Sequence, residues 1–178
     1  MGKKIPKIIS QTEFETLFKE VQKSKHKKHK EIMLAMLLAF EAGMRISEIL
    51  GYDGKNKIQP LQKEQIDQTS IRVVQGKGKK DRIIARPKRV NANAVKMLPL
   101  KLQRRTLQRF ITILGRKVLD KHITFHTLRH GFATHYYNKT KDILGLQQTL
   151  GHSRTDTTSI YAHTNPEQTI NKIREVFE

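Results

Sequence analysis

Apolar positions follow a helical spacing through the first third of the chain. Ser10 and Glu13 have the spacing of a capping box, and apolar residues on one face follow them, which predicts a first helix. Residues 31–42 are broadly apolar and predict a central helix that stops at Gly43. A short helical turn is expected directly afterwards, at residues 45–50. This part of the chain is therefore predicted to be helical around a buried second helix.

The pattern changes in the middle of the chain, where β-branched residues cluster. Residues 71–74 and 82–85 predict two strands, joined through residues 75–81, a connection that contains two glycines. Helical patterns then return, and the helices expected there are 103–118, 127–137, 143–150 and a tail helix at 166–177. The pattern as a whole predicts a mostly helical α+β fold with a small antiparallel β-sheet.

Charge narrows the class of partner. The 178 residues carry a formal net charge of +19, and the lysines and arginines run along the whole chain. A folded domain this basic repels itself unless it meets a polyanion, which favours nucleic acid. An anionic membrane is the weaker candidate, because a basic surface helix usually carries aromatic anchors and the chain has no tryptophan. The basic run at residues 23–30 fits a solvated loop or a phosphate contact equally well.

Several functional classes are excluded or disfavoured. The chain has no cysteine, so disulfides, thiolate–zinc sites and a cysteine nucleophile are ruled out. No run approaches the roughly 20 apolar residues of a membrane span. The lysines at the N-terminus are not followed by the apolar region of a secretory signal. The length favours one domain.

Four short motifs carry groups suited to attack on a phosphodiester. They are residues 43–48 (GMRISE), 76–78 (GKG), 126–130 (HTLRH) and 150–152 (LGH), the last followed nine residues later by Tyr161. Such an attack builds negative charge on the non-bridging oxygens. It therefore needs permanently charged guanidinium groups, a proton donor for the leaving oxygen and a positioned nucleophile.

In this order and spacing, the motifs resemble those of the tyrosine recombinase family, which includes phage-type integrases and Xer-like resolvases. Residues 124–134 and 150–163 are the most specific stretches, and the resemblance extends from about residue 10 to the C-terminus. It implies an enzyme that cleaves and rejoins double-stranded DNA through a covalent 3′-phosphotyrosyl intermediate. It also implies that the reaction needs no metal, no ATP and no other cofactor.

The resemblance assigns the groups that bind the phosphate. Arg45 and Arg129 would clamp the non-bridging oxygens, and His152 would donate a hydrogen bond to the same phosphate. Glu48 matches an acidic residue that supports the active site without taking part in the chemistry.

It also assigns the groups that move protons. Tyr161 would be the nucleophile, His126 would assist proton transfer at the tyrosine, and Lys77 would protonate the departing 5′ oxygen. A free tyrosine has a pKa near 10, and a surrounding cluster of arginine and histidine would lower that pKa by favouring the phenolate.

DNA contacts outside the active site are expected at two places. Arg104 and Arg105 open the helix at 103–118, in a segment that approaches DNA in the family. Lys79 and Lys80 flank Lys77 in the connection between the strands. Most such contacts would be to phosphate and carry no sequence information.

Each residue also has a simpler interpretation. Arg45 alone could be a surface arginine, and Glu48 could be its partner in an ordinary helical ion pair. His126 and His130 have a spacing that can bind zinc, but no third ligand stands in a convincing position, so no metal site is expected. Tyr161 alone could be a core aromatic. The complete ordered set, and no single member, favours the catalytic interpretation.

The expected domain organisation is a basic leader at 1–9 followed by a catalytic domain at 10–178. Full recombinases of the family usually add an N-terminal DNA-binding domain that completes a clamp, and we expect that domain to be absent from this chain. The tail helix could dock onto a neighbouring protomer, giving a tetramer on DNA, or could fold back on its own domain. A cytoplasmic, nucleoid-associated location in the host cell of a prokaryotic or mobile-element protein follows from the same resemblance.

Two other functions stay open at this point. A type IB topoisomerase uses a similar set of residues but rejoins the same strand, so it would relax DNA without exchanging strands. A non-catalytic DNA-binding module would need only the basic surface.

Overall fold

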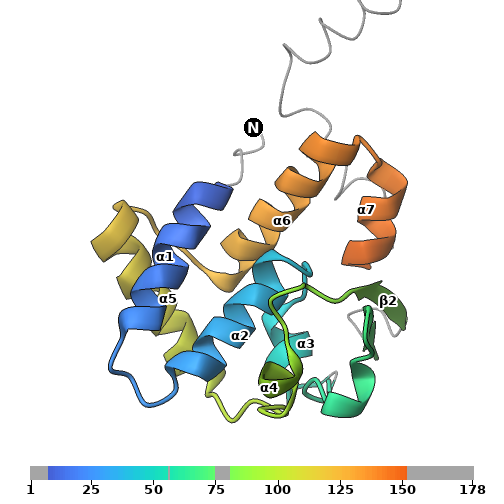
Figure 1. The fold of residues 1–178 in the computed structure, drawn as a ribbon, viewed down its shortest axis with the longest axis horizontal. Coiled ribbons are helices and arrows are strands. Elements are labelled where there is room, and N and C mark those ends of the chain that lie inside the picture. The colour runs from blue at the N-terminus through green and yellow to red at the C-terminus, as the bar shows by residue number, and fades with distance from the viewer. Residues whose placement is uncertain (1–7, 56, 75–80, 152–178) are drawn as a thin grey trace, which may run out of the picture.

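The computed structural model describes residues 8–55, 57–74 and 81–151 (Figure 1). In chain order their elements are α1 (Gln11–Lys23), α2 (His29–Phe40), α3 (Ile46–Leu50), the 3-10 helix η1 (Lys63–Gln65), β1 (Ser70–Val73), β2 (Arg82–Ala85), α4 (Ala92–Val95), α5 (Arg104–Leu119), α6 (Phe125–Thr140) and α7 (Ile143–Leu150). The predicted mostly helical α+β fold with a small antiparallel sheet is confirmed.

The first helix begins where the capping box predicts. The Ser10 hydroxyl accepts a hydrogen bond from the Glu13 amide at 3.1 Å, and the Ser10 amide donates to the Glu13 carboxylate at 2.9 Å. Both bonds satisfy amides that lack a partner inside the helix. The face buried below this cap is the predicted one, formed by Phe14, Leu17, Phe18 and Val21.

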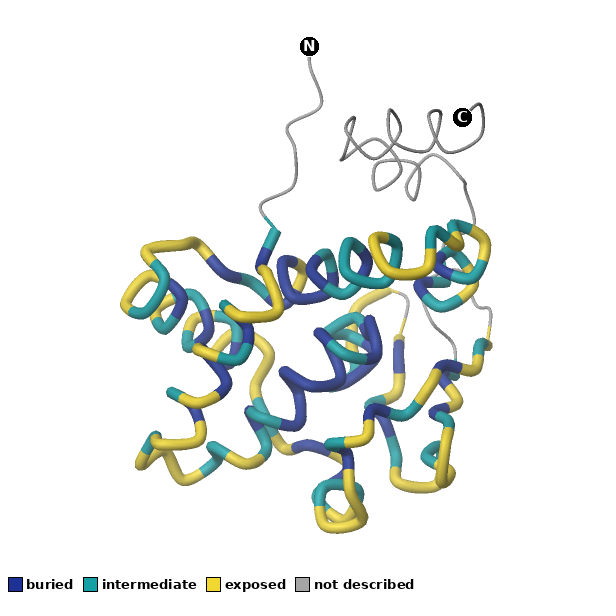
Figure 2. The backbone as a smooth tube through the Cα atoms, turned by 45° about the horizontal axis from the view of Figure 1, so that its top comes forward, coloured by how far each residue is buried: buried dark blue, intermediate teal, exposed yellow. Residues whose placement is uncertain are grey.

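The central helix α2 is the core of the domain. Most of its residues are buried, and it packs against α1 and α6, as the dark central coil in Figure 2 shows. The Phe40 ring stacks on the Phe14 ring of α1 with a centroid distance of 4.0 Å. After α2 the chain turns at Gly43, whose φ of +63° favours glycine. A side chain there would also meet the Phe132 ring of α6 at 2.6 Å, so the turn fits closely against that helix.

The sheet has the predicted position and direction. β1 and β2 pair antiparallel, with Ile71 opposite Ile84 and Val73 opposite Arg82. Ile71, Val73 and Ile84 are buried, so one face of the ribbon packs on the core. Residues 75–80 of the connection lie outside the described residues.

The second half adds the helices α5 (Arg104–Leu119), α6 and α7 around this core. α6 runs from Phe125 to Thr140, which is longer at both ends than the predicted 127–137, because Thr124 caps it and Lys141 ends it in a left-handed conformation. α7 has the predicted bounds. The short α4, capped by Asn91, was not predicted. In the described part of the chain, no helix has the length and apolarity needed to cross a membrane.

Two expected segments fall wholly or mainly outside the described residues. The tail helix at 166–177 is one, and most of the leader at 1–9 is the other. Ile9, at the end of that leader, is buried beside Gly131 of α6.

Candidate active site

Arg45 and Glu48 form one unit at the start of α3. Arg45 is the N-cap residue, and its amide donates to the Glu48 carboxylate at 2.8 Å. Its guanidinium donates to the same carboxylate at 2.7 Å. The Glu48 side chain is 1% exposed and that of Arg45 19% exposed, so a buried acid holds an arginine that still reaches the surface.

Arg82, at the start of β2, is a second partner of Glu48 that the sequence analysis did not single out. Its Nη1 and Nη2 donate to the two carboxylate oxygens at 2.9 and 2.8 Å, in the bidentate geometry that only arginine provides. Its Nε donates to the Thr149 carbonyl at 2.7 Å. A sequence signal did exist: Arg82 stands two residues before Ile84 and therefore lies on the same, buried face of the strand, where a cation needs an acidic partner.

These contacts fix the charge of Glu48. Burial alone would raise the pKa of this carboxyl, but the hydrogen bonds and positive charge of Arg82, together with the charge of Arg45, outweigh it and lower the pKa to about 2. Glu48 is therefore ionised at neutral pH. It faces two guanidinium groups, so it cannot be an ordinary surface partner of Arg45.

Arg129, on α6, lies in the same cluster. It is 5% exposed, and its Nη2 donates to the Leu150 carbonyl at 2.7 Å while its Nη1 donates to the Gly43 carbonyl. The structure thus brings the two predicted phosphate-binding arginines, Arg45 and Arg129, to one place. We refer to Arg45, Arg82 and Arg129 as the arginine cluster.

The arginine cluster meets the C-terminal end of α7. Three successive backbone carbonyls there accept hydrogen bonds from the cluster. Arg82 donates to the carbonyl of Thr149, and Arg129 donates to that of Leu150. Arg45 donates to that of Gly151 at 3.3 Å. Carbonyls at a helix C-terminus have no partner within the helix and carry its partial negative charge, so they are natural acceptors for cations. The end of α7, immediately before His152, is therefore fixed against the cluster.

Two histidines of α6 lie beside the arginine cluster. The Nε2 atoms of His126 and His130 are 2.8 Å apart, and the rings meet edge to face. Burial and then the charges of Arg129 and Arg45 lower the pKa of His126, and burial, His126 and Arg129 lower that of His130 to about 4. Both shifts favour the neutral imidazole, which is the form that accepts a proton.

Lys77, Lys79, Lys80, His152 and Tyr161 lie outside the described residues. Within the described ranges, no group of three or more histidine or acidic side chains could hold a metal ion.

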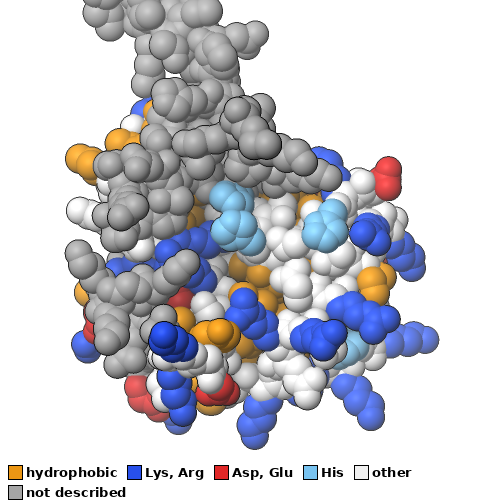
Figure 3. Space-filling model, turned by 180° about the vertical axis from the view of Figure 1, so that it is seen from behind, with side chains coloured by type: hydrophobic (Ala, Val, Ile, Leu, Met, Phe, Trp, Pro, Cys, Tyr) orange, Lys and Arg blue, Asp and Glu red, His pale blue; other side chains and the backbone are white. Residues whose placement is uncertain are grey.

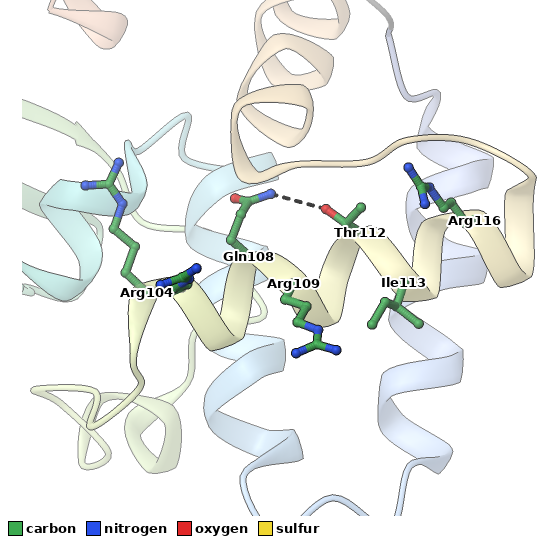
Figure 4. Close-up of a pocket in the computed structure, with 7 residues that line it drawn as sticks. Arg104, Gln108, Arg109, Thr112, Ile113 and Arg116 are labelled. Carbon is green, nitrogen blue, oxygen red and sulfur yellow. Dashed lines mark hydrogen bonds between the residues drawn. The ribbon is translucent and has the colours of Figure 1, made fainter.

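Arg104 and Arg105 lie away from the cluster, at the exposed start of α5. They lie along an open side of this helix together with Gln108, Arg109, Thr112, Ile113 and Arg116 (Figure 4). The Arg104 guanidinium lies 5.6 Å from the centre of the Tyr52 ring. Lysine and arginine side chains gather on the face seen in Figure 3, where acidic ones are few. α5 therefore presents a basic ridge of Arg104, Arg105, Arg109 and Arg116.

Comparison with known proteins agrees with this arrangement. Residues 94–168 match the phage integrase family. The tyrosine recombinase XerC of Chlamydia pneumoniae is 29% identical over an alignment of 187 positions, which covers 90% of this chain and 55% of that protein. The chain spans about half the length of the curated relatives it matches.

Solved structures share the fold. The XerH site-specific recombinase, in a pre-cleavage complex with its difH substrate, superposes with a TM-score of 0.68 at 23% identity, over 99% of this chain and 55% of that one. The catalytic domain of bacteriophage HP1 integrase gives a TM-score of 0.64 at 23% identity, over 95% of this chain and 94% of that domain. The ordered motifs, the sequence match and the shared fold agree, and the chain belongs to the tyrosine recombinase family, whose catalytic-domain fold it has.

Proposed function

We propose that this chain is the catalytic domain of a site-specific DNA recombinase, which cleaves and rejoins DNA strands through a phosphotyrosyl bond to Tyr161. The observation that carries the proposal is the arginine cluster. Arg45 and Arg129 come from distant parts of the sequence, yet both donate to the end of α7. Two guanidinium groups brought to one place are what a phosphodiester in the transition state requires.

In the proposed reaction, the Tyr161 oxygen attacks the phosphorus and the bond from phosphorus to the 5′ oxygen breaks. His126, neutral beside Arg129, accepts the tyrosine proton, and Lys77 gives a proton to the departing 5′ oxygen. The bond from tyrosine to phosphorus keeps the energy of the original ester. A 5′ hydroxyl from another strand can therefore reverse the step without ATP.

Arg45, Arg129 and His152 would hold the non-bridging oxygens throughout. Their contribution is electrostatic, because charge that is fixed in place before the reaction does not have to reorganise when negative charge develops. Glu48 supports them by holding Arg45 at 2.7 Å.

Double-stranded DNA is the proposed substrate. The net charge of +19 and the basic ridge on α5 support it, with Arg104 and Arg105 as phosphate contacts and Lys79 and Lys80 as further ones. XerH, which shares the fold, was solved with a difH DNA substrate.

Assembly and location are also proposals. The segment after Pro166 has an apolar face of Ile170, Ile173, Val176 and Phe177, which suits docking onto a neighbouring protomer in a tetramer on DNA. Such an enzyme would act on the nucleoid, in the cytoplasm of the host cell.

Trapping of the covalent intermediate tests the proposal. Because the recognition sequence is not known, the protein is incubated with a pool of nicked duplexes of random sequence, in which release of a short strand beside the nick prevents rejoining. Wild type should give a protein–DNA adduct that survives denaturant, and Tyr161→Phe should give none. An adduct of equal yield with Tyr161→Phe would refute the assignment of the nucleophile.

The two other functions are separated by a second assay. Two duplexes with different labels are built from the sequence recovered from the adduct. Recombination predicts strands that carry both labels, and relaxation of a supercoiled plasmid without such strands at any protein concentration favours a topoisomerase. DNA binding without any adduct favours a non-catalytic module. Cleavage should also persist in EDTA, and its loss there would revive a metal-dependent mechanism.

A further inference from the structure

Arg82 is tied to two parts of the site at once. It is the first residue of β2, and its side chain is only 8% exposed. One edge of its guanidinium holds both oxygens of Glu48, and its Nε holds the Thr149 carbonyl near the end of α7. The side chain therefore links the sheet, α3 and α7.

Its bonds to Glu48 determine how that acid can hold Arg45. One carboxylate oxygen accepts from Arg45 Nη1 and Arg82 Nη1, and the other accepts from the Arg45 amide and Arg82 Nη2. Four hydrogen bonds fix the plane of the carboxylate. If Arg82 were removed, Glu48 could rotate, and the Arg45 guanidinium could move with it.

Its bond to α7 acts on the other side of the site. The contact is close, because a Cβ on Gly151 would lie 3.2 Å from Arg82 Cδ, and Gly151 has a φ of +62°. The neighbouring carbonyls, those of Leu150 and Gly151, receive Arg129 and Arg45. Arg82 thus holds the segment against which the two predicted phosphate-binding arginines rest.

Arg82 itself is placed poorly for direct contact with DNA. Its Nε, Nη1 and Nη2 all donate to protein acceptors, the Thr149 carbonyl and the two carboxylate oxygens of Glu48. Its influence on a phosphate would therefore pass through Arg45 and the end of α7.

We infer that Arg82 is a positioning residue for the cleavage step: it orients Glu48, and through Glu48 it orients Arg45, while it holds the end of α7. This inference rests on the proposed function. A lysine cannot replace Arg82, since an ammonium group cannot bind two carboxylate oxygens and a separate carbonyl in one plane.

The test compares Arg82→Lys with wild type on the nicked duplex recovered from the random pool. At saturating protein, the rate of adduct formation in a single turnover should fall by about 10- to 100-fold, because small displacements of catalytic groups have effects of this size. The matched control is Arg72→Lys on the neighbouring strand, whose partner is Asp81 and whose side chain is 65% exposed. Its rate should equal that of wild type.

A second substrate separates positioning from loss of folded protein. It carries a methylphosphonate at the scissile position, which removes the charge of one non-bridging oxygen and so reduces the need for Arg45. The ratio of the rates on the two substrates does not depend on how much protein is folded. In Arg82→Lys, the ratio of the methylphosphonate rate to the phosphodiester rate should rise about tenfold over wild type, as expected for weaker transition-state stabilisation by an arginine.

The outcomes are distinct. An unchanged ratio in Arg82→Lys, or a wild-type rate on the phosphodiester, overturns the positioning role while the proposed function stands. If wild type forms no adduct that depends on Tyr161, the proposed function fails, and this role of Arg82 fails with it. A raised ratio together with a slower phosphodiester rate supports both.

Discussion

Replacement of Glu48 by glutamine should make part of the stability of this domain independent of pH. Glu48 is 3% exposed, and the two arginines beside it hold its pKa at about 2, against an ordinary value of 4.5. Because the folded-state pKa lies below that of the unfolded chain, the ionised carboxylate stabilises the fold above about pH 4.5. That stabilisation is lost as the pH falls towards 2.

The size of the effect follows from the shift. A difference of about 2.5 pKa units corresponds to about 3 kcal/mol of unfolding free energy, since one unit is about 1.4 kcal/mol. About 1.4 kcal/mol of this is lost by pH 3.5, where the unfolded carboxyl is mostly protonated and the folded one is still ionised. At neutral pH, Glu48→Gln should be less stable than wild type by about 3 to 5 kcal/mol, because Arg45 and Arg82 lose their common partner.

Urea unfolding followed by circular dichroism measures this at constant ionic strength, from pH 6.5 to pH 3.5. The difference in unfolding free energy between wild type and Glu48→Gln should fall by about 1.4 kcal/mol over that range. The control is Glu20→Gln, which removes an exposed partner of Lys23 and should change the stability by less than about 1 kcal/mol. If this difference in unfolding free energy were the same at every pH, Glu48 would have an ordinary pKa in the folded state, and the argument from its two arginines would fail.

Three other changes test the fold and the DNA-binding surface. Gly131→Ala should lower the unfolding free energy by about 1 to 3 kcal/mol, because the new methyl group would lie 2.7 Å from Phe40 and 2.8 Å from Ile9. An unchanged midpoint of urea unfolding would mean that α6 does not pack this closely against Phe40 and Ile9. Thr124→Ala should cost about 1 kcal/mol in the same measurement, since it removes the side-chain cap of α6; no loss would show that water replaces the cap. Arg109→Gln should reduce the slope of log affinity against log salt for duplex DNA by about 1 in a fluorescence titration, and an unchanged slope would place the α5 ridge off the DNA.

Local signals in the sequence were enough to predict most of the elements. The capping box at Ser10 and the two-glycine connection between the strands act over a few residues, so the chain shows them without knowledge of the fold. The short α4 was missed because four residues cannot display a helical period, and the cap at Asn91 was its only signal.

The sequence motifs predicted that Arg45 and Arg129 would lie together, but they did not predict the groups that hold these two side chains. Arg45 and Arg129 stand in recognisable motifs, and the structure places them together. Their acceptors in α7 are backbone carbonyls, which every residue type possesses, so no sequence pattern could identify them. Arg82 was missed for a related reason: its role depends on Glu48, which is distant in sequence and reaches it only through tertiary packing.

The arginine cluster leaves the folded domain with an excess of buried positive charge. Arg45 and Arg82 share one carboxylate, that of Glu48, so these three side chains together carry a net charge of +1 (two positive, one negative). Neutral carbonyls at the end of α7 hold the cations in place without cancelling their mutual repulsion. An anion that binds there relieves this repulsion and favours the folded state over the unfolded one. A phosphodiester at this site would therefore be a stabilising ligand of the domain as well as its proposed substrate.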